Sequence, residues 1–416
     1  MELLPFEGSF AYMEEAATTK LFFFPPLPVD TMSVETALRA RLLDIAKVNP
    51  WILATIVTNK GKPHLAVPSS AAVTASVVGE VFSRTSLPDV STTTPYTDLA
   101  KHSTKHFALK TASQRKNKPT RVTKFTLNEN SKGVTLAVSM CHVAGDGYTF
   151  FRLIDMIDPA NEITPLTAKR NLTVGGEVHN AGGGKREKDM LLLDLTGGNW
   201  ALTCNMIGGM MCGKTTRALS YYVDADKVTQ EKREVVGRGT ARFVSTNDIL
   251  VSTHGKAFEN RILLMAINWR ERRELPGLGS DLAGNYEGCL VFDPPSYRCP
   301  SSIRKTLESP QRPKIRVDGI PIPGTCEQFS LKYGLCTNWA FKYTLHLPGA
   351  ESVDYALALP LYDINEGTGG IDISIVYYAQ PGRLAVLYIS PNATDERVKG
   401  VSGSVLGEVV GRGVFD

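Results

Sequence analysis

One short segment of this 416-residue chain brings together residue types that suit acid–base chemistry, the sequence HVAGDG at residues 142–147. It contains His142, then Asp146 and Gly147. An imidazole, with an ordinary pKa of about 6.5, can take a proton from an attacking hydroxyl or amine at neutral pH. Taken alone, the hexapeptide is equally compatible with a core histidine before an ordinary Gly-Asp-Gly turn. The surrounding sequence has to decide between the two.

The residues around HVAGDG predict a strand before it and a helix after it. Residues 121–127 and 134–140 flank the turn-forming NENSKG and predict a hairpin. A helical pattern follows over residues 148–157, YTFFRLIDMI. His142 is therefore expected just after a strand end and before a helix, where a loop side chain is held by two rigid elements.

Helices and strands are mixed along the rest of the chain. Ser33 is the expected N-cap of an amphipathic helix over residues 34–48, and a capped helix is expected to begin near Asp248. A hairpin is expected from residues 51–57 and 63–67. Further strands are expected over residues 217–225, 261–269, 353–361, 371–379 and 383–390. The predicted fold class is α/β, with mixed sheets in both halves.

The length and one change of composition predict two domains. Single cores stop growing at roughly 250 to 300 residues, and this chain is longer. Periodicity disappears from about residue 160 to 215, where the chain is rich in Gly, Asn and Lys. We therefore predict an N-terminal domain over residues 1–160, a crossover linker over residues 161–215 and a C-terminal domain over residues 216–416.

Composition excludes several classes of protein. The net charge is only +4 and no dense basic run occurs, so a nucleic-acid partner is not expected. The seven cysteines are odd in number and include no CxxC pair, which indicates reduced thiols in the cytoplasm rather than disulfides or a zinc site. Cys141 is expected to be a packed core thiol. The chain shows neither a secretory signal nor the apolar run of about 20 residues that crosses a membrane.

Two further segments follow HVAGDG in the order of a known family. They are FVSTNDILVSTHGKAF leading to LLMAINWRERRELPGLGSDLAGNYEG, and LCTNWAFKYTLHLPG. Together the three resemble the BAHD-type plant and fungal acyltransferases, of the superfamily that includes chloramphenicol acetyltransferase and the condensation domains. Where plant members carry DFGWG this chain reads TLHLPGAE, so it resembles a divergent member. The resemblance implies two chloramphenicol-acetyltransferase-like domains with an active-site tunnel at their interface.

The resemblance also implies an activity. A monomeric, cytoplasmic enzyme of specialised metabolism would move an acyl group from acyl-CoA to a hydroxyl or amine of a small-molecule acceptor, with His142 as general base and no metal. Asp146 would pair with Arg270 and hold the loop in shape. Gly147 would permit a close approach of loop and helix that a side chain would block.

Two more groups of residues match functional positions of the family. Thr337 and Trp339 would donate hydrogen bonds to the oxyanion that forms when the thioester is attacked. Trp339 as a plain core residue is the alternative. The residues that precede the expected helix, where the phosphates of coenzyme A would bind, are Ser245, Thr246 and Asn247. Helix capping alone explains these three equally well.

Other interpretations of the sequence remain in view. Residues 208–215, GGMMCGKT, match the P-loop pattern, but a strand rather than a helix is expected after them. His102 and His106 have a spacing that would suit a shared metal, yet no third ligand is in reach in the sequence, which favours a surface helix. The alternatives in function are a condensation-type domain acting on carrier-protein thioesters, and an inactive binding protein of the same fold.

Overall fold

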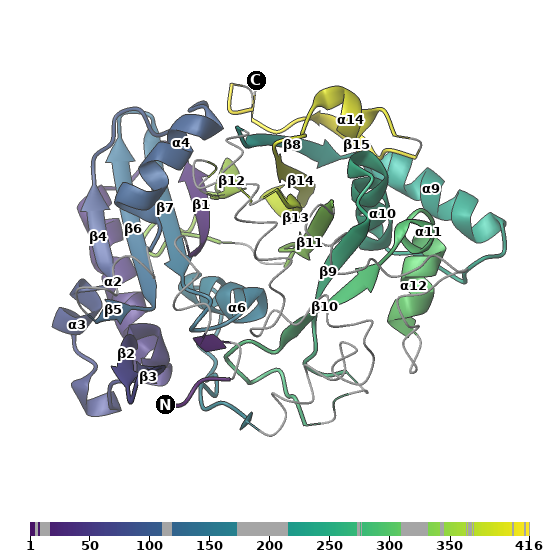
Figure 1. Cartoon of the computed structure of the whole chain (residues 1–416). Coiled ribbons are helices and arrows are strands. Elements are labelled where there is room, and N and C mark those ends of the chain that lie inside the picture. Colours follow the sequence, from purple (N-terminus) through teal and green to yellow (C-terminus); the bar gives the residue numbers. More distant parts are fainter. Residues whose placement is uncertain are drawn as a thin grey trace.

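The computed structural model describes most of the chain. The described residues are 1–4, 7–8, 17–109, 119–172, 215–272, 275, 277–308, 332–341, 345–362, 364, 368, 370–401, 403–411 and 413–415. Their strands form two large sheets and one small one, and most helices lie on the outside of the sheets (Figure 1). The expected α/β class with mixed sheets is confirmed.

The first sheet carries the strand that leads to His142. Its strand order is β12-β1-β7-β6-β4, and only β4 and β6 run parallel. The bounds are β1 Thr18–Phe24, β4 Phe82–Thr85, β6 Thr123–Asn130, β7 Gly133–Met140 and β12 Leu357–Pro360. The expected hairpin of β6 and β7 is present, in antiparallel register from Thr123 opposite Met140 to Asn130 opposite Gly133. β12 comes from the C-terminal half, so the two halves of the chain share this sheet.

The second sheet is built from the C-terminal half. Its order is β10-β9-β11-β13-β14-β8-β15, with β11 parallel to both of its neighbours and the other pairs antiparallel. The bounds are β8 Arg217–Val223, β9 Ile262–Asn268, β10 Glu287–Phe292, β11 Tyr333–Asn338, β13 Asp372–Gln380, β14 Arg383–Ser390 and β15 Leu406–Val409. A small sheet, β3-β2-β5, joins β2 Thr55–Asn59, β3 Lys62–Ala66 and β5 Thr120–Arg121.

Most helices cover the outer faces of the sheets, whereas α6 lies between the two halves of the chain (Figure 1). In the N-terminal half they are α2 Thr31–Val48, α3 Ala75–Gly79, α4 Tyr96–His102 and α6 Gly147–Ile157. In the C-terminal half they are α9 Ala225–Gly237, α10 Thr246–Phe258, α11 Pro294–Tyr297, α12 Pro300–Glu308 and α14 Asp395–Lys399. Short helical turns occupy Pro50–Leu53, Ser70–Ala72 and Ser103–Phe107.

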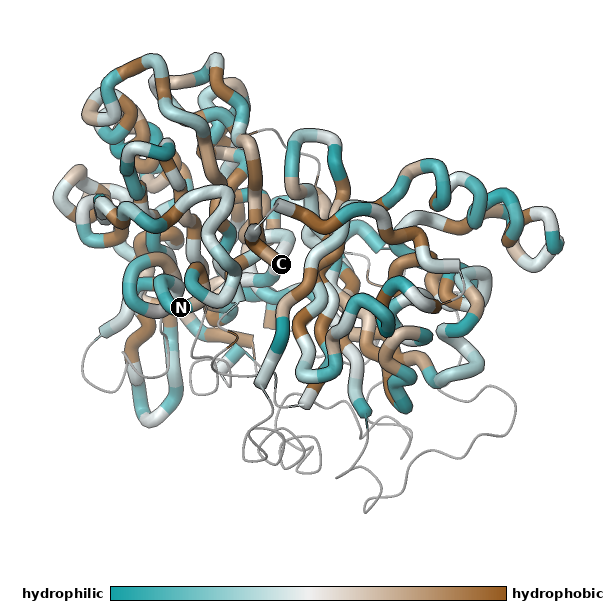
Figure 2. The backbone as a smooth tube through the Cα atoms, turned by 90° about the horizontal axis from the view of Figure 1, so that it is seen from above, coloured by the Kyte–Doolittle hydropathy of each residue, from teal (hydrophilic) through white to brown (hydrophobic). Residues whose placement is uncertain are grey.

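Apolar side chains pack on both faces of each large sheet. Helices α2 and α6 bury their apolar faces, including Leu38 and Phe150, against the first sheet. Leu21 and Phe23 point to its other face and pack with Ile375 of the second sheet. Seen from above, hydrophobic and hydrophilic residues follow each other at short intervals along the strands (Figure 2). The two halves are therefore packed together through a buried core that begins beside β1 and β7.

Two local expectations are wrong, and both failures concern where an element begins. Helix α2 begins at Thr31 with Asp30 as its N-cap, because the Asp30 carbonyl already accepts from the Ser33 amide at 3.0 Å. Ser33 therefore lies inside the helix. Residues 51–53 form a helical turn rather than strand, since Pro50 has the fixed φ that starts such a turn, and β2 begins only at Thr55.

The predicted division into residues 1–160, 161–215 and 216–416 stays a prediction. Most of the expected linker, residues 173–214, lies outside the described residues. Among the helices that the structure describes, none is long and apolar enough to cross a bilayer.

Candidate active site

His142 lies in the turn that joins β7 to α6. Strand β7 ends at Met140 and α6 begins at Gly147, so both neighbouring elements fix the ends of the turn. The His142 side chain is half-buried, and its backbone carbonyl accepts a hydrogen bond from Asn285 Nδ2 at 2.6 Å. Cys141 is fully buried, as expected of a packed thiol. The turn holds the imidazole beside a rigid strand end, with part of its surface accessible.

Asp146 ends the turn and is held by a buried ion pair. Arg270 Nη1 donates to Asp146 Oδ2 at 2.7 Å, and both side chains are only 1% exposed. The carboxylate also accepts from the backbone amides of Thr149 and Tyr286, at 3.0 Å each. The first of these bonds caps α6. Asp146 is thus turned into the protein, where it ties the turn to the β9–β10 region.

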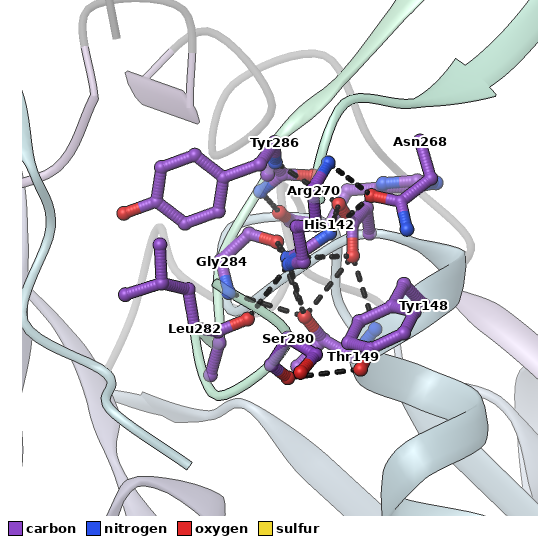
Figure 3. A network of polar contacts seen from close by, with 12 residues as sticks. His142, Tyr148, Thr149, Asn268, Arg270, Ser280, Leu282, Gly284 and Tyr286 are labelled. Atoms are coloured by element: carbon purple, nitrogen blue, oxygen red, sulfur yellow. Dashed lines mark hydrogen bonds and ion pairs between the residues drawn. The ribbon is translucent and has the colours of Figure 1, made fainter. Parts of the chain in front are cut away.

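Arg270 extends this network by binding backbone carbonyls. Its guanidinium donates to the carbonyls of Leu282 at 2.9 Å and Gly284 at 2.8 Å, and to Asn268 Oδ1 at 2.9 Å. It also lies over the rings of Tyr148 and Tyr286, with distances to the ring centroids of 4.6 and 5.0 Å. Figure 3 shows these groups converging on the guanidinium. Loss of the Asp146 carboxylate would leave the buried Arg270 guanidinium with only neutral hydrogen-bond acceptors.

The glycine that permits the close approach is not the expected one. A Cβ on Gly147 would meet no atom within 4 Å. A Cβ on Gly145 would lie 2.7 Å from Cβ of Thr149, a distance that real side chains do not adopt. The proposed packing role of Gly147 is therefore wrong, because Gly147 opens the helix on its half-exposed side while Gly145 faces the first helical turn.

A second buried charge cluster touches the same turn and was not predicted. Arg170 Nε donates to Glu7 Oε2 at 2.8 Å, with side chains 1% and 0% exposed. Arg170 also donates to the carbonyls of Val143 and Ala144, at 3.2 and 2.9 Å. Arg170 falls in the region expected to be a linker, and neither it nor Glu7 belongs to a motif. The sequence carries no local signal that would have found this pair.

Thr337 and Trp339 lie at the end of β11, and both are half-buried. The Trp339 ring packs against Phe150 and Phe151, with ring centroids 6.3 and 5.9 Å away. Trp339 is thereby placed against the first two turns of α6, the helix that follows the HVAGDG turn. This packing fits both interpretations of Trp339, and its role as an oxyanion donor stays a prediction.

Ser245, Thr246 and Asn247 form the capped N-terminus of α10. The Ser245 hydroxyl accepts from the Asp248 amide at 3.1 Å, and Asp248 Oδ2 accepts from the Ser245 amide at 2.7 Å, which completes a capping box. Asn247 Oδ1 accepts from Asn338 Nδ2 at 3.1 Å. This bond joins the helix start to the strand end that carries Thr337. Binding of coenzyme A there stays a prediction.

Glu287, the first residue of β10, adds an acidic group to this region. It follows Tyr286, whose amide binds Asp146, and it pairs in register with Asn268. Burial, together with the negative charge of Asp146, raises the pKa of Glu287 to about 8, against the opposing effect of Arg270. The group is therefore largely protonated at neutral pH and presents a hydrogen-bond donor.

The structure covers the two other motifs to different extents. Within the P-loop-like segment only Thr215 is a described residue, and β8 follows it as the expected strand. His102 ends α4 and lies 2.8 Å from Asp89 Oδ2, and its ring centroid is 5.9 Å from that of His106. Across the described part of the chain, no three His, Cys, Asp or Glu side chains gather as a metal would require.

Comparisons with known proteins show the fold. No protein-family model matches the chain. No curated protein matches it by sequence. TRI101 of F. sporotrichioides, complexed with coenzyme A and T-2, matches with a TM-score of 0.59 at 13% identity, over 99% of this chain and 100% of that chain. The epimerization domain from the third module of tyrocidine synthetase B matches with a TM-score of 0.55 at 12% identity, over 96% and 93%.

A third match is the first condensation domain of the CDA synthetase, with a TM-score of 0.53 at 10% identity, over 96% of this chain and 92% of that chain. At such identities the likeness concerns the fold, and it spans nearly the whole of each chain. The expected α/β fold of two chloramphenicol-acetyltransferase-like halves is therefore confirmed.

Proposed function

We propose that this protein transfers an acyl group from acyl-CoA to a hydroxyl or amine of a small-molecule acceptor, with His142 as general base. The observation that carries the proposal is the position of His142, half-buried in a turn that two elements and a buried ion pair hold in place. The whole-chain likeness to TRI101 with coenzyme A and T-2 supports it. The HVAGDG motif and its resemblance to the BAHD-type family support the same chemistry.

The proposed reaction has one proton carrier. The His142 imidazole takes the proton of the acceptor hydroxyl or amine while the oxygen or nitrogen attacks the thioester carbonyl carbon. Thr337 and Trp339 donate hydrogen bonds to the resulting oxyanion. The C–S bond then breaks, and the thiolate of coenzyme A receives the proton from the imidazolium. No metal and no covalent acyl-enzyme take part in this scheme, and free coenzyme A and the acylated acceptor are the products.

The remaining assignments complete the proposal. Coenzyme A would bind beside Ser245, Thr246 and Asn247, and the reactants would meet in a tunnel between the two halves. We propose a monomeric, cytoplasmic enzyme of specialised metabolism. Asp146 and Arg270 keep the turn in shape and do not touch the substrate.

Condensation-type chemistry is the second candidate, since the fold is shared with a condensation domain. That reaction uses carrier-protein thioesters, and the domains that perform it usually read HHxxxDG. Cys141 stands where the first of those histidines would be, and this favours acyl-CoA as the donor.

The test is thiol release from a panel of acyl-CoAs. Acetyl-CoA and longer acyl-CoAs are mixed with hydroxyl and amine acceptors, with T-2 and deoxynivalenol included because TRI101 structures contain them. His142→Ala should lower the rate by roughly two to four orders of magnitude. The matched control is His64→Ala, at a half-buried histidine of β3. Retention of more than about a tenth of the rate in His142→Ala contradicts a general base.

A parallel arm offers an acyl group on a carrier protein. Transfer from that donor but not from acyl-CoA would establish the condensation-type alternative. An absence of transfer from both, with coenzyme A still bound in a calorimetric titration, would favour the inactive binding protein.

A further inference from the structure

The buried pair of Glu7 and Arg170 is fully satisfied by hydrogen bonds. Glu7 Oε1 accepts from the Asn285 amide at 3.0 Å and from Asn285 Nδ2 at 2.8 Å, and Glu7 Oε2 accepts from the Leu4 amide at 2.8 Å. A buried pair tolerates its loss of hydration only when such additional bonds are present. The geometry of this pair is therefore specific, and it joins the N-terminal segment to the segment before β10.

Arg170 uses its five N–H donors within this cluster. Nε binds Glu7, and Nη1 donates to the carbonyls of Ala168 at 2.8 Å and Ala283 at 3.0 Å. Nη2 donates to the carbonyls of Val143 and Ala144. A lysine, with three donors on one atom, would not span these acceptors. A planar fork is what this position requires.

Together with Asn285, the cluster holds three consecutive carbonyls of the HVAGDG turn. Asn285 Nδ2 binds the carbonyl of His142, and Arg170 binds those of the next two residues. Because the carbonyls of His142 and of the two residues after it are all held by hydrogen bonds, the backbone at His142 has little freedom. The orientation of the His142 side chain from the backbone is thereby restricted.

The segment at residues 283–286 lies between this cluster and that of Asp146. The carbonyl of Ala283 and the amide of Asn285 bind Arg170 and Glu7. The carbonyl of Gly284 and the amide of Tyr286 bind the Asp146 and Arg270 pair instead. A Cβ on Gly284 would lie 2.9 Å from the Arg170 guanidinium, so the segment and the cluster are in close contact.

We propose that Glu7, Arg170 and Asn285 are positioning residues that orient His142 for catalysis by fixing the backbone of residues 142–144. The inference rests on the proposed role of His142, and it adds residues from the N-terminal segment and from the expected linker to the catalytic architecture. None of the three touches the reacting atoms. Their effect passes through the carbonyls of the turn.

The test compares Asn285→Ala with a matched control. Asn285→Ala removes the side-chain bonds to the His142 carbonyl and to Glu7 Oε1, and it leaves the charges of Glu7 and Arg170 in place. The control is Arg41→Met, because Arg41 also binds three carbonyls, those of Met156, Asp158 and Asn161, at the opposite end of α6. Arg170→Lys, which keeps the charge but loses the fork, is the second variant and preserves the test should Asn285→Ala not fold.

The first readout does not depend on activity. The protein is labelled with 15N-histidine, and the ring signals of its seven histidines are recorded, with His142 assigned from its absence in His142→Ala. In Asn285→Ala and Arg170→Lys the His142 ring signals should shift or broaden while the other signals stay, and Arg41→Met should leave His142 unchanged. Superimposable His142 signals, or equal changes at all histidines, overturn the proposal.

The second readout is steady-state kinetics with acetyl-CoA and whichever acceptor supports turnover. Asn285→Ala should lower kcat by about tenfold to a hundredfold, the cost of a misplaced catalytic group, while KM for acetyl-CoA changes by less than about threefold. An equal loss in Arg41→Met overturns the inference, since that loss would be general. Should the wild-type protein show no transfer, the proposed function fails, and the histidine spectra still decide whether the cluster holds His142.

Discussion

Two buried arginine–carboxylate pairs flank the HVAGDG turn, and they hold it through different groups. Asp146 and Arg270 join the end of the turn to the region of β9 and β10, with the carboxylate inside the turn itself. Glu7 and Arg170 are both outside the turn and reach it only through backbone carbonyls. The first pair therefore fixes a side chain of the motif, whereas the second fixes the backbone that carries His142.

The partners of both pairs are far apart along the chain, but the two pairs differ in the elements and motifs that carry them. Asp146 is the N-cap of α6 and Arg270 follows the end of β9, and each occupies a position that a motif marks. Glu7 lies before β1, and Arg170 lies in the irregular chain that follows the end of α6. Buried charges have to be paired wherever they occur, so a paired arginine outside a motif is as informative about the turn as one within it.

The largest expected effect comes from Asp146→Asn. Asparagine caps a helix about as well as aspartate, so α6 should keep its cap while Arg270 loses its anion. Removing one member of a buried pair typically costs about 3 to 5 kcal/mol, and we expect that loss in the free energy of unfolding, measured by urea titration, along with reduced activity. Glu7→Gln should cost a similar amount. Unchanged stability with lost activity would instead make Asp146 catalytic.

The unequal predictability of the two pairs has a physical cause. The strand, turn and helix around His142 follow from apolar periodicity, and β7, α6 and α10 are found where the sequence predicts them. Arg270 was predicted through its motif. Arg170 was not, because its partners are mostly backbone carbonyls, which leave no trace in the identity of residues 143 and 144.

A second effect, which depends on pH, concerns only the Asp146 pair, since Glu287 lies beside Asp146. A carboxyl whose pKa is raised to about 8 stays protonated in the folded protein while the unfolded chain ionises near its ordinary value. Its contribution to stability is therefore complete below about pH 4.5 and is lost as the pH rises toward about 8. The slope is at most about 1.4 kcal/mol per pH unit for one proton.

Glu287→Gln removes this titration. Its free energy of unfolding, relative to that of the wild type, should rise between about pH 5 and 8 and level off above, as measured by urea titrations at several pH values. In the Asp146→Asn background the rise should end at lower pH, because the negative charge that helps to raise the pKa of Glu287 is gone. Parallel pH profiles of the wild type and Glu287→Gln would show that Glu287 titrates normally.

The smallest expected effect comes from replacing either of the two glycines that flank Asp146, Gly145 and Gly147, by alanine. At Gly147 a methyl group meets open space at the first residue of α6, and alanine is a better helix former than glycine by about 0.5 to 1 kcal/mol. Gly147→Ala should therefore keep or slightly raise the melting temperature and leave transfer within a few-fold of normal.

Gly145→Ala places its methyl group 2.7 Å from Thr149, so it should lower both the melting temperature and the rate of transfer. Because Thr149 binds Asp146 and not Arg170, that damage should appear first in the Asp146 cluster, as increased hydrogen exchange at the Thr149 and Tyr286 amides. If Gly147→Ala instead lowered the melting temperature and transfer more than Gly145→Ala did, the close approach would depend on Gly147.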